Sequence, residues 1–404
     1  MTTTYSAVSS TLGDSLFTSA TQNPQVDQYA QNSLLKGLQQ FSNGKYTQAI
    51  ATFKQAIGYS PTSTTAVNAY DYLAQSYIQL GDTNSAINTY KKSIAAVSNQ
   101  DTTHTSLANL YYSIGDYSSA VKEYAQAAKL NPSASNLYSL GQGYLADGQY
   151  NNAMKEFSQV RRLAPNQSYG DSGMGQVYAA QGQYADAITS FQKALKINPK
   201  DWNAYADMGY ALADSGQLDQ AQAVADSLQS NDANLSGQLS TYIYGKTPPQ
   251  LAAETYAMLG SPFLTVLGPG TKVADLGDYK LATPDAQQTF SVAFQFSKPM
   301  DATSVQDVQN WSITRATGNS FSSKDYNYGA PTPSTEVSLP YYPTAVSYDP
   351  STLTATVLFT VTQNSTGNGT IDPSHIQFGF NGKDVTGATM DPKANEYTGF
   401  SGFA

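Results

Sequence analysis

The chain has 404 residues, which is enough for two or three domains with sizeable cores. Charged residues make up only 13% of it, against roughly 25% in most soluble proteins, and tyrosine occurs 30 times. The net charge of −9 is spread along the chain, with 14 Lys and Arg against 18 Asp and Glu up to residue 270. Nucleic acid and anionic membranes require clustered Lys and Arg, so this composition argues against both as partners.

Cysteine is absent, which excludes disulfides, thiolate catalysis and cysteine metal sites. No apolar run approaches the length of about 18 residues that a membrane-spanning helix needs. The first ten residues lack the basic and apolar regions of a secretory signal. We therefore expect either an extracellular or cell-surface protein exported by a route without such a signal, or a cytoplasmic protein.

Residues 1–26 form an arm rich in Ser, Thr and Ala. Its apolar residues recur at helical spacing, yet the Ser and Thr content suits an extended strand equally well. An arm this short needs a cover, which is either the first unit of its own array or a neighbouring subunit, and the second case would build filaments. The residues assigned to this assembly role are Tyr5, Val8, Leu12, Leu16 and Phe17.

A repeated spacing of glycines organises residues 27–230. The steps between successive glycines are 37, 34, 33, 34 and 34 residues, a period that predicts a stacked array of helix pairs. The six glycines are Gly44, Gly81, Gly115, Gly148, Gly182 and Gly216.

The fifth unit shows why this spacing forms two helices. Gly182 is predicted to end the first helix in the left-handed conformation, and Pro199 follows the second because it cannot continue the hydrogen-bond ladder. Ala187 and Ala194 allow the helices to approach closely, and Phe191 fills the space between neighbouring units. Because one helix pair cannot bury its apolar face alone, stability is nearly a sum over units and their interfaces.

Two first helices complete the pattern with Met174-Gly175-Gln-Val-Tyr178 and Leu140-Gly141-Gln-Gly-Tyr144. With them the array resembles tetratricopeptide repeats, whose first helices line a concave groove. By this register the groove is neutral and lacks a Lys and Arg clamp for a carboxylate, which suits an uncharged peptide, a polar protein surface or a glycan. Its predicted lining residues are Asn68, Asp71, Gln75, Tyr138, Gln142, Tyr169, Ser172, Gln176, Asn203 and Tyr210.

One more helix is predicted from Thr247 to Gly260. Thr247 would be its N-cap, Pro248 would occupy the first turn and Gly260 would end it. This helix would cap the solenoid, so the helical domain is expected to span residues 27–260.

Beyond Gly260 the apolar period changes from helical to two. Phe290–Phe296 and Leu353–Val361 alternate apolar and polar residues, as half-buried strands do, and the turns between strands are dense in Gly, Pro, Asn and Asp. The whole protein is thus expected to be multidomain α + β, an all-α solenoid followed by an all-β sandwich over residues 261–404.

Four motifs of this region come in the order found in bacterial Ig-like domains of surface-layer and adhesin-type proteins. They are Phe296-Ser-Lys-Pro-Met-Asp, Asn310-Trp-Ser-Ile313, Val346-Ser-Tyr-Asp-Pro and Lys383-Asp-Val-Thr-Gly387. The region resembles such an Ig-like domain, with an inserted Tyr-rich loop over residues 317–344 that we expect to be a contact surface.

Candidates for chemistry are few. His104 and His375 are the two histidines, and neither lies near a nucleophile or a zinc-ligand pattern. Asp372, Asp384 and Asp391 are interpreted as turn residues, because the alternating ligands of a calcium loop are missing. We therefore predict no enzyme activity, no cofactor and no metal.

Three functions are compatible with these features. The first is an extracellular structural protein, a filament or cell-surface subunit whose partner is itself or another surface protein. The second is a tetratricopeptide repeat adaptor that holds a protein partner in its groove. The third is an adhesin that binds a glycan through the Tyr-rich loop. Low charge and the surface-layer-like motifs favour the first.

Overall fold

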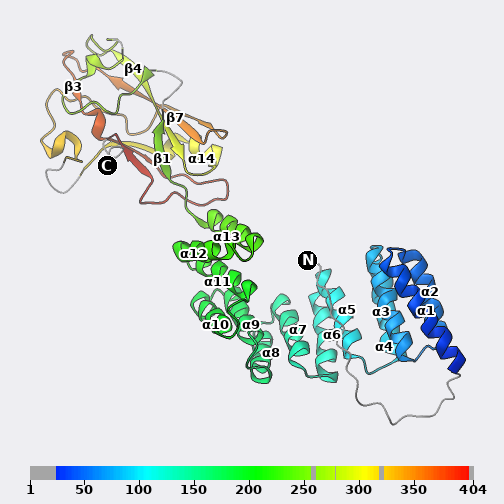
Figure 1. The fold of residues 1–404 in the computed structure, drawn as a ribbon. Coiled ribbons are helices and arrows are strands. Elements are labelled where there is room, and N and C mark those ends of the chain that lie inside the picture. The colour runs from blue at the N-terminus through cyan, green and yellow to red at the C-terminus, as the bar shows by residue number, and fades with distance from the viewer. Residues whose placement is uncertain (1–23, 256–260, 278, 318–322, 400–404) are drawn as a thin grey trace. The chain divides into compact units, whose positions relative to one another are not determined.

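The computed structural model describes residues 24–255, 261–277, 279–317 and 323–399 (Figure 1). They form two compact units. The first unit runs to Ser215 and includes Asp226–Leu235, and the second contains Gly216–Ala225 and the described residues from Ser236 onward.

Thirteen helices occupy the described residues from Pro24 to Lys246. They alternate as first and second helices of successive pairs, with α13 following the sixth pair. Their bounds are α1 Pro24–Ser42, α2 Tyr46–Tyr59, α3 Thr64–Gln79, α4 Thr83–Ala96, α5 Asp101–Ser113, α6 Tyr117–Leu130, α7 Ala134–Ala146, α8 Tyr150–Leu163, α9 Tyr169–Ala180, α10 Tyr184–Ile197, α11 Trp202–Asp214, α12 Leu218–Gln229 and α13 Ala233–Lys246.

The six periodic glycines follow the first helix of each pair, as predicted. Their φ angles lie between +72° and +82°, a left-handed conformation that a side chain with a Cβ disfavours. Each chain reversal therefore depends on glycine, which explains why the period is read most clearly in that residue.

A second set of glycines serves packing rather than turning. A Cβ at Gly175 in α9 would lie 2.7 Å from the ring of Phe191 in α10, and one at Gly141 in α7 would lie 2.7 Å from the ring of Phe157 in α8. Both rings are fully buried. The first helix thus leaves a gap that the aromatic ring of its own pair fills, and Phe191 also packs with Ala204 and Ala211 of the next pair.

The helix predicted from Thr247 to Gly260 is wrong. After α13 the chain forms strand β1 (Leu251–Thr255), which pairs antiparallel with β4 (Gln287–Phe296), while residues 256–260 lie outside the described part. The hydroxyl of Thr247 donates to the Ile243 carbonyl of α13 instead of capping a new helix. The cap signals are local, and pairing with a strand some forty residues away outweighs them.

Small, mainly antiparallel sheets make up the rest of the second unit. One sheet has the order β1-β4-β7-β6, with β2 (Ser261–Pro262) pairing parallel to β4. A second has the order β10-β9-β5, and a third joins β3 to β8. The remaining bounds are β3 Thr271–Lys272, β5 Trp311–Arg315, β6 Ala345–Asp349, β7 Thr354–Thr362, β8 Thr370–Ile371, β9 Ile376–Phe380 and β10 Glu396–Thr398, with a short helix α14 at Ala302–Gln306.

The predicted alternation of the two long strands is present. Phe290 of β4 lies opposite Phe359 of β7 in a register that places both rings in the core. β7 begins at Thr354, one residue later than the pattern, because Leu353 has a φ of +57° and belongs to the preceding turn.

Aromatic rings join two of the sheets in one core. The ring centroid of Phe294 lies 5.3 Å from that of Phe378, and that of Phe296 lies 5.2 Å from that of Phe380. Phe294 and Phe296 belong to β4, whereas Phe378 and Phe380 belong to β9 of the three-stranded sheet. The Ig-like assignment of this unit stays a prediction.

Candidate functional site

Successive first helices lie side by side in the array. α5, α7, α9 and α11 form a series in which each helix contacts the next. Residues one period apart in sequence therefore share one surface. We call the surface of Ala134–Ala146, Tyr169–Ala180 and Trp202–Asp214 the first-helix face.

A ladder of hydrogen bonds crosses this face. The side-chain amide of Gln142 donates to the Tyr138 hydroxyl at 2.9 Å and to Oε1 of Gln176 at 2.8 Å. Nε2 of Gln176 in turn donates to Oδ2 of Asp207 at 2.8 Å. Gln142 and Gln176 are 34 residues apart, so the ladder links equivalent positions of neighbouring repeats and holds these side chains in place.

A hollow of about 260 Å³ opens beside the ladder. Its walls combine amides and carboxylates with an apolar patch from three first helices and one second helix. We call it the polar hollow; it is lined by Gln142, Leu145, Gln176, Ala179, Phe191, Asp207, Tyr210, Ala211 and Asp214.

A second hollow of about 410 Å³ lies between α7, α9 and the loop that joins α8 to α9. The ring centroids of Tyr138 and Tyr169 are 5.7 Å apart in its wall, and Tyr169 is 51% exposed. We call this hollow the tyrosine pocket; Ala134, Ser135, Ala164 and Gln167 complete its lining. Tyr138 connects it to the ladder, because its hydroxyl accepts from Gln142.

The carboxyl group of Asp207 carries an electrostatic cost. Burial raises its pKa above the ordinary value, and the nearby charge of Asp201 adds to this effect, while the hydrogen bond from Gln176 opposes it. Among the described residues, Gln176 is the side chain that donates to it. The groove predicted as neutral thus contains carboxylates at Asp207 and Asp214.

Sequence reasoning missed both aspartates, although their spacing could have revealed them. Asp207 precedes Tyr210 by three residues and Asp214 follows it by four, and such positions share one face of a helix. The predicted lining was limited to the repeat positions nearest each glycine and did not extend one turn to either side.

The predicted groove residues fall into separate groups. Tyr138, Gln142, Gln176 and Tyr210 gather at the ladder and the polar hollow, and Tyr169 lines the tyrosine pocket.

The other predicted groove residues lie apart from these hollows. Asp71 and Gln75 form a distinct cluster, in which Nε2 of Gln75 donates to Asp71 at 2.7 Å and burial raises the pKa of Asp71. Asn68 and Asn203 are exposed, and Ser172 is buried.

The predicted arm residues Tyr5, Val8, Leu12, Leu16 and Phe17 lie outside the described residues. Their role in assembly therefore stays a prediction.

The two histidines are both held by carboxylates. Nδ1 of His104 lies 2.7 Å from Glu123 on α6, which ties the two helices of the third pair together. His375, which the sequence suggests to be a loop residue, is fully buried in a short 3₁₀ turn, Pro373–His375.

Serine, histidine and aspartate meet at His375 without the geometry of a catalytic triad. Nδ1 of His375 lies 2.7 Å from Oδ2 of Asp372, and Nε2 lies 2.9 Å from the Ser323 carbonyl oxygen. A triad needs Nε2 at the serine hydroxyl, but the Ser374 hydroxyl donates to Asp372 instead. All three side chains are buried, so the cluster joins backbone segments rather than reacting with a substrate.

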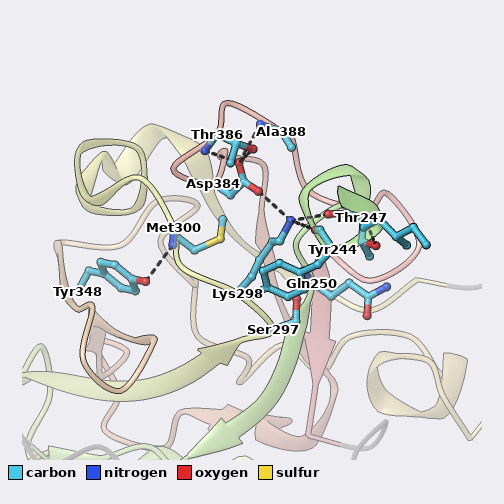
Figure 2. Close-up of polar contacts among 11 residues, drawn as sticks. Tyr244, Thr247, Gln250, Ser297, Lys298, Met300, Tyr348, Asp384, Thr386 and Ala388 are labelled. Atoms are coloured by element: carbon cyan, nitrogen blue, oxygen red, sulfur yellow. Dashed lines mark hydrogen bonds and ion pairs between the residues drawn. The ribbon is translucent and has the colours of Figure 1, made fainter. Parts of the chain in front are cut away.

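Asp384 and Lys298 form a buried polar centre in the second unit (Figure 2). Nζ of Lys298 lies 3.1 Å from Oδ2 of Asp384 and donates to the carbonyls of Tyr244 at 2.9 Å and Thr247 at 2.6 Å. Burial opposes ionisation of Asp384, yet hydrogen bonds from Thr386, Lys298 and Ala388 hold its pKa below the ordinary value. The ammonium group thus caps the end of α13 and fastens it to the sheet.

The three aspartates considered for calcium have protein partners. Oδ1 of Asp384 accepts from the backbone of Thr386 and Ala388, and Asp391 accepts from the Lys393 backbone and the Gln250 side chain. In the described part of the chain, no three His, Cys, Asp or Glu side chains gather as metal ligands would. A helix both long and apolar enough to cross a bilayer is likewise absent from the described residues.

Comparison with known proteins identifies the array. Residues 31–63, 67–96 and 105–168 match the tetratricopeptide repeat family, and residues 175–221 match TPR repeats. The helical region is therefore a tetratricopeptide repeat solenoid, as the spacing predicts. No curated protein matches the chain.

Several solved structures are similar to the array. A tetratricopeptide repeat protein from Parabacteroides merdae is 18% identical, with a TM-score of 0.47 over 54% of this chain and 88% of that one. Pseudomonas aeruginosa PilF is 17% identical, with a TM-score of 0.42 over 54% and 99%. YrrB, described as a TPR protein with an unusual peptide-binding site, is 18% identical, with a TM-score of 0.35 over 47% and 97%.

Proposed function

We propose that this chain is a non-enzymatic adaptor that binds a segment of a partner protein along its first-helix face. The observation that carries the proposal is the pair of adjoining hollows on α7, α9 and α11, connected through Tyr138 and the amide ladder. Together they offer aromatic area and fixed hydrogen-bonding groups, which are the features of protein-recognition surfaces.

The adaptor proposal replaces the filament subunit favoured by composition. The repeat-family matches support a protein-binding scaffold, since tetratricopeptide repeats typically mediate protein–protein interactions. The arm that would build a filament lies outside the described residues. Location at the cell surface is a separate proposal, and protease treatment of intact cells tests it by releasing the protein or leaving it intact.

A glycan is a second candidate ligand, for the second unit. Tyr341 and Tyr342 are 56% and 49% exposed, and their ring centroids lie 4.8 Å apart. The Tyr341 carbonyl accepts from the Ile313 amide at the edge of β5, which anchors the pair to the sheet. Exposed and anchored rings suit stacking on a sugar. A glycan array tests this candidate, with hits that Tyr341→Ala removes as the supporting result.

Selection from a displayed library of random 12-residue peptides tests the adaptor proposal, with the full chain as bait. Bound peptides should lose about tenfold in affinity, roughly 1.4 kcal/mol, when Tyr169→Ala and Tyr210→Ala are combined on the first-helix face. Gln192→Ala is the matched control, because Gln192 is exposed on the second helix α10. The proposal fails if no peptide is selected, or if the control weakens binding as much as the tyrosine variants.

A further inference from the structure

Charge is segregated between the two kinds of helix in the array, although it is spread evenly along the sequence. The first helices α3, α5, α7, α9 and α11 contain five aspartates and no Lys or Arg. The second helices α2, α4, α6, α8 and α10 contain ten Lys and Arg and three acidic residues. Only α1, among the first helices up to α11, carries a lysine, Lys36, besides its Asp27.

Most of these aspartates are already matched by protein groups. Asp171 lies 3.4 Å from the Arg161 guanidinium, and Asp101 accepts from the side chains of Asn131 and Asn136. Asp207 and Asp214 differ because both line the polar hollow, and no Lys or Arg is among its lining residues. The hollow is therefore a negatively charged recess in an acidic face.

The walls of the polar hollow fit a particular kind of side chain. Leu145, Ala179, Phe191 and Ala211 supply apolar surface, and the carboxylates of α11 supply negative charge. Lysine and arginine combine these two properties, since an aliphatic stem packs on apolar surface while the charged head reaches a carboxylate. A carboxylate of the partner would instead meet like charge.

We infer that the polar hollow binds a lysine or arginine side chain from an extended segment of the partner protein. This inference rests on the proposed adaptor function and adds the chemistry of the ligand to it. The stem lies against Phe191 and Ala211, and the cationic head pairs with Asp207 and Asp214. Bound charge of this kind also compensates the desolvated carboxyl group of Asp207.

Four pools of seven-residue peptides test the inference. They share degenerate flanks and differ in a fixed central residue, which is Lys, Arg, Gln or Glu. The full chain should bind the Lys and Arg pools about tenfold more tightly than the Gln pool, and the Glu pool least, as charge pairing in a partly desolvated site requires. The preference should fall with added salt.

Asp207→Asn and Asp214→Asn keep the shape of each side chain and remove its charge. Each should reduce the preference for Lys and Arg over Gln by at least threefold, and the double variant should abolish it. Asp186→Asn is the control, because Asp186 is an exposed residue of the second helix α10 and its loss changes the net charge equally. Circular dichroism checks that all variants are folded.

The outcomes separate this inference from the adaptor proposal. Equal binding of all four pools, still lost with Tyr169→Ala and Tyr210→Ala, would sink the cationic ligand and leave the adaptor proposal standing. A Lys preference that Asp186→Asn reduces as much as Asp207→Asn would show attraction by net charge only and would also overturn the inference. Absence of binding by every pool contradicts both proposals.

Discussion

The two units bury their aromatic rings in different ways. In the array each ring fills a gap left by a glycine of its own repeat, as Phe157 does at Gly141 and Phe191 at Gly175, and the apolar residues form separate clusters. In the second unit, rings from β4, β5, β7 and β9 belong to one continuous core. The array should therefore behave as a chain of locally stabilised repeats, and the second unit as one cooperative block.

The largest expected effect comes from removing one ring in each unit. Phe191→Ala and Phe294→Ala should each lower the free energy of unfolding by about 3–5 kcal/mol, because each leaves a large cavity. Hydrogen exchange should accelerate around α9–α11 in the first variant and throughout the sheets in the second. The comparison is broken if Phe191→Ala loosens α2 as well, or if Phe294→Ala loosens only β4.

Loss of the buried lysine should come next. Lys298→Met is expected to lower the free energy of unfolding by about 3 kcal/mol, since it leaves Asp384 buried without its cation. Chemical denaturation measures this effect, and Lys383→Met, at an exposed neighbouring position, should stay within about 0.5 kcal/mol of the parent. A similar result for both lysines would mean that the polar centre does not stabilise the second unit.

A methyl group added at a packing glycine should have a smaller effect. Gly175→Ala is expected to cost about 1–3 kcal/mol, because the new Cβ would lie 2.7 Å from the Phe191 ring. Gly58→Ala is the matched control: it lies in α2 with no atom near its added Cβ, and should gain about 0.5–1 kcal/mol. Equal effects of the two changes, measured by thermal unfolding, would contradict the proposed ring-in-gap packing.

The smallest effect concerns pH and has opposite signs in the two units. Burial raises the pKa of Asp207, so the folded state holds its proton more tightly, and this group should stabilise the array as pH falls through its raised pKa. Asp384 has a lowered pKa, so its contribution is present above the unfolded value of 3.8 and is lost as pH falls through the lower folded value.

Asp207→Asn should therefore flatten the pH dependence of the array above pH 3.8 and raise its stability at neutral pH by up to about 1 kcal/mol. Urea denaturation between pH 4 and pH 7 measures both changes. A lower stability of this variant at neutral pH would mean that the carboxylate is better satisfied than its contacts indicate.

The array was predictable because its signals are local. Gly182 ends a helix by its own conformation, and the partner of Phe191 lies sixteen residues away in the same repeat. The helix predicted after Thr247 failed for the opposite reason. Its cap residues are local, but Leu251 finds its partner in Phe296, and single-sequence patterns carry no information about such pairing.

The candidate site was predictable in part for the same reason. The repeat register places Gln142 and Gln176 together, and the structure joins them by a hydrogen bond. The acidic character of the face was missed because charge was counted along the chain. Only the assignment of residues to first and second helices shows that Asp207 and Lys193 belong to different surfaces.

The contact between Lys298 and the end of α13 determines how the second unit can be exchanged or excised. A cut just after α13 would remove the Tyr244 carbonyl from its ammonium partner and separate a helix end from the group that caps it. A transplantable module therefore has to begin before Ala233, so that α13 travels with the sheets. Recombination between repeat proteins would conserve function at that junction, and a chimaera joined at Pro248 would inherit an uncapped helix and an unmatched lysine.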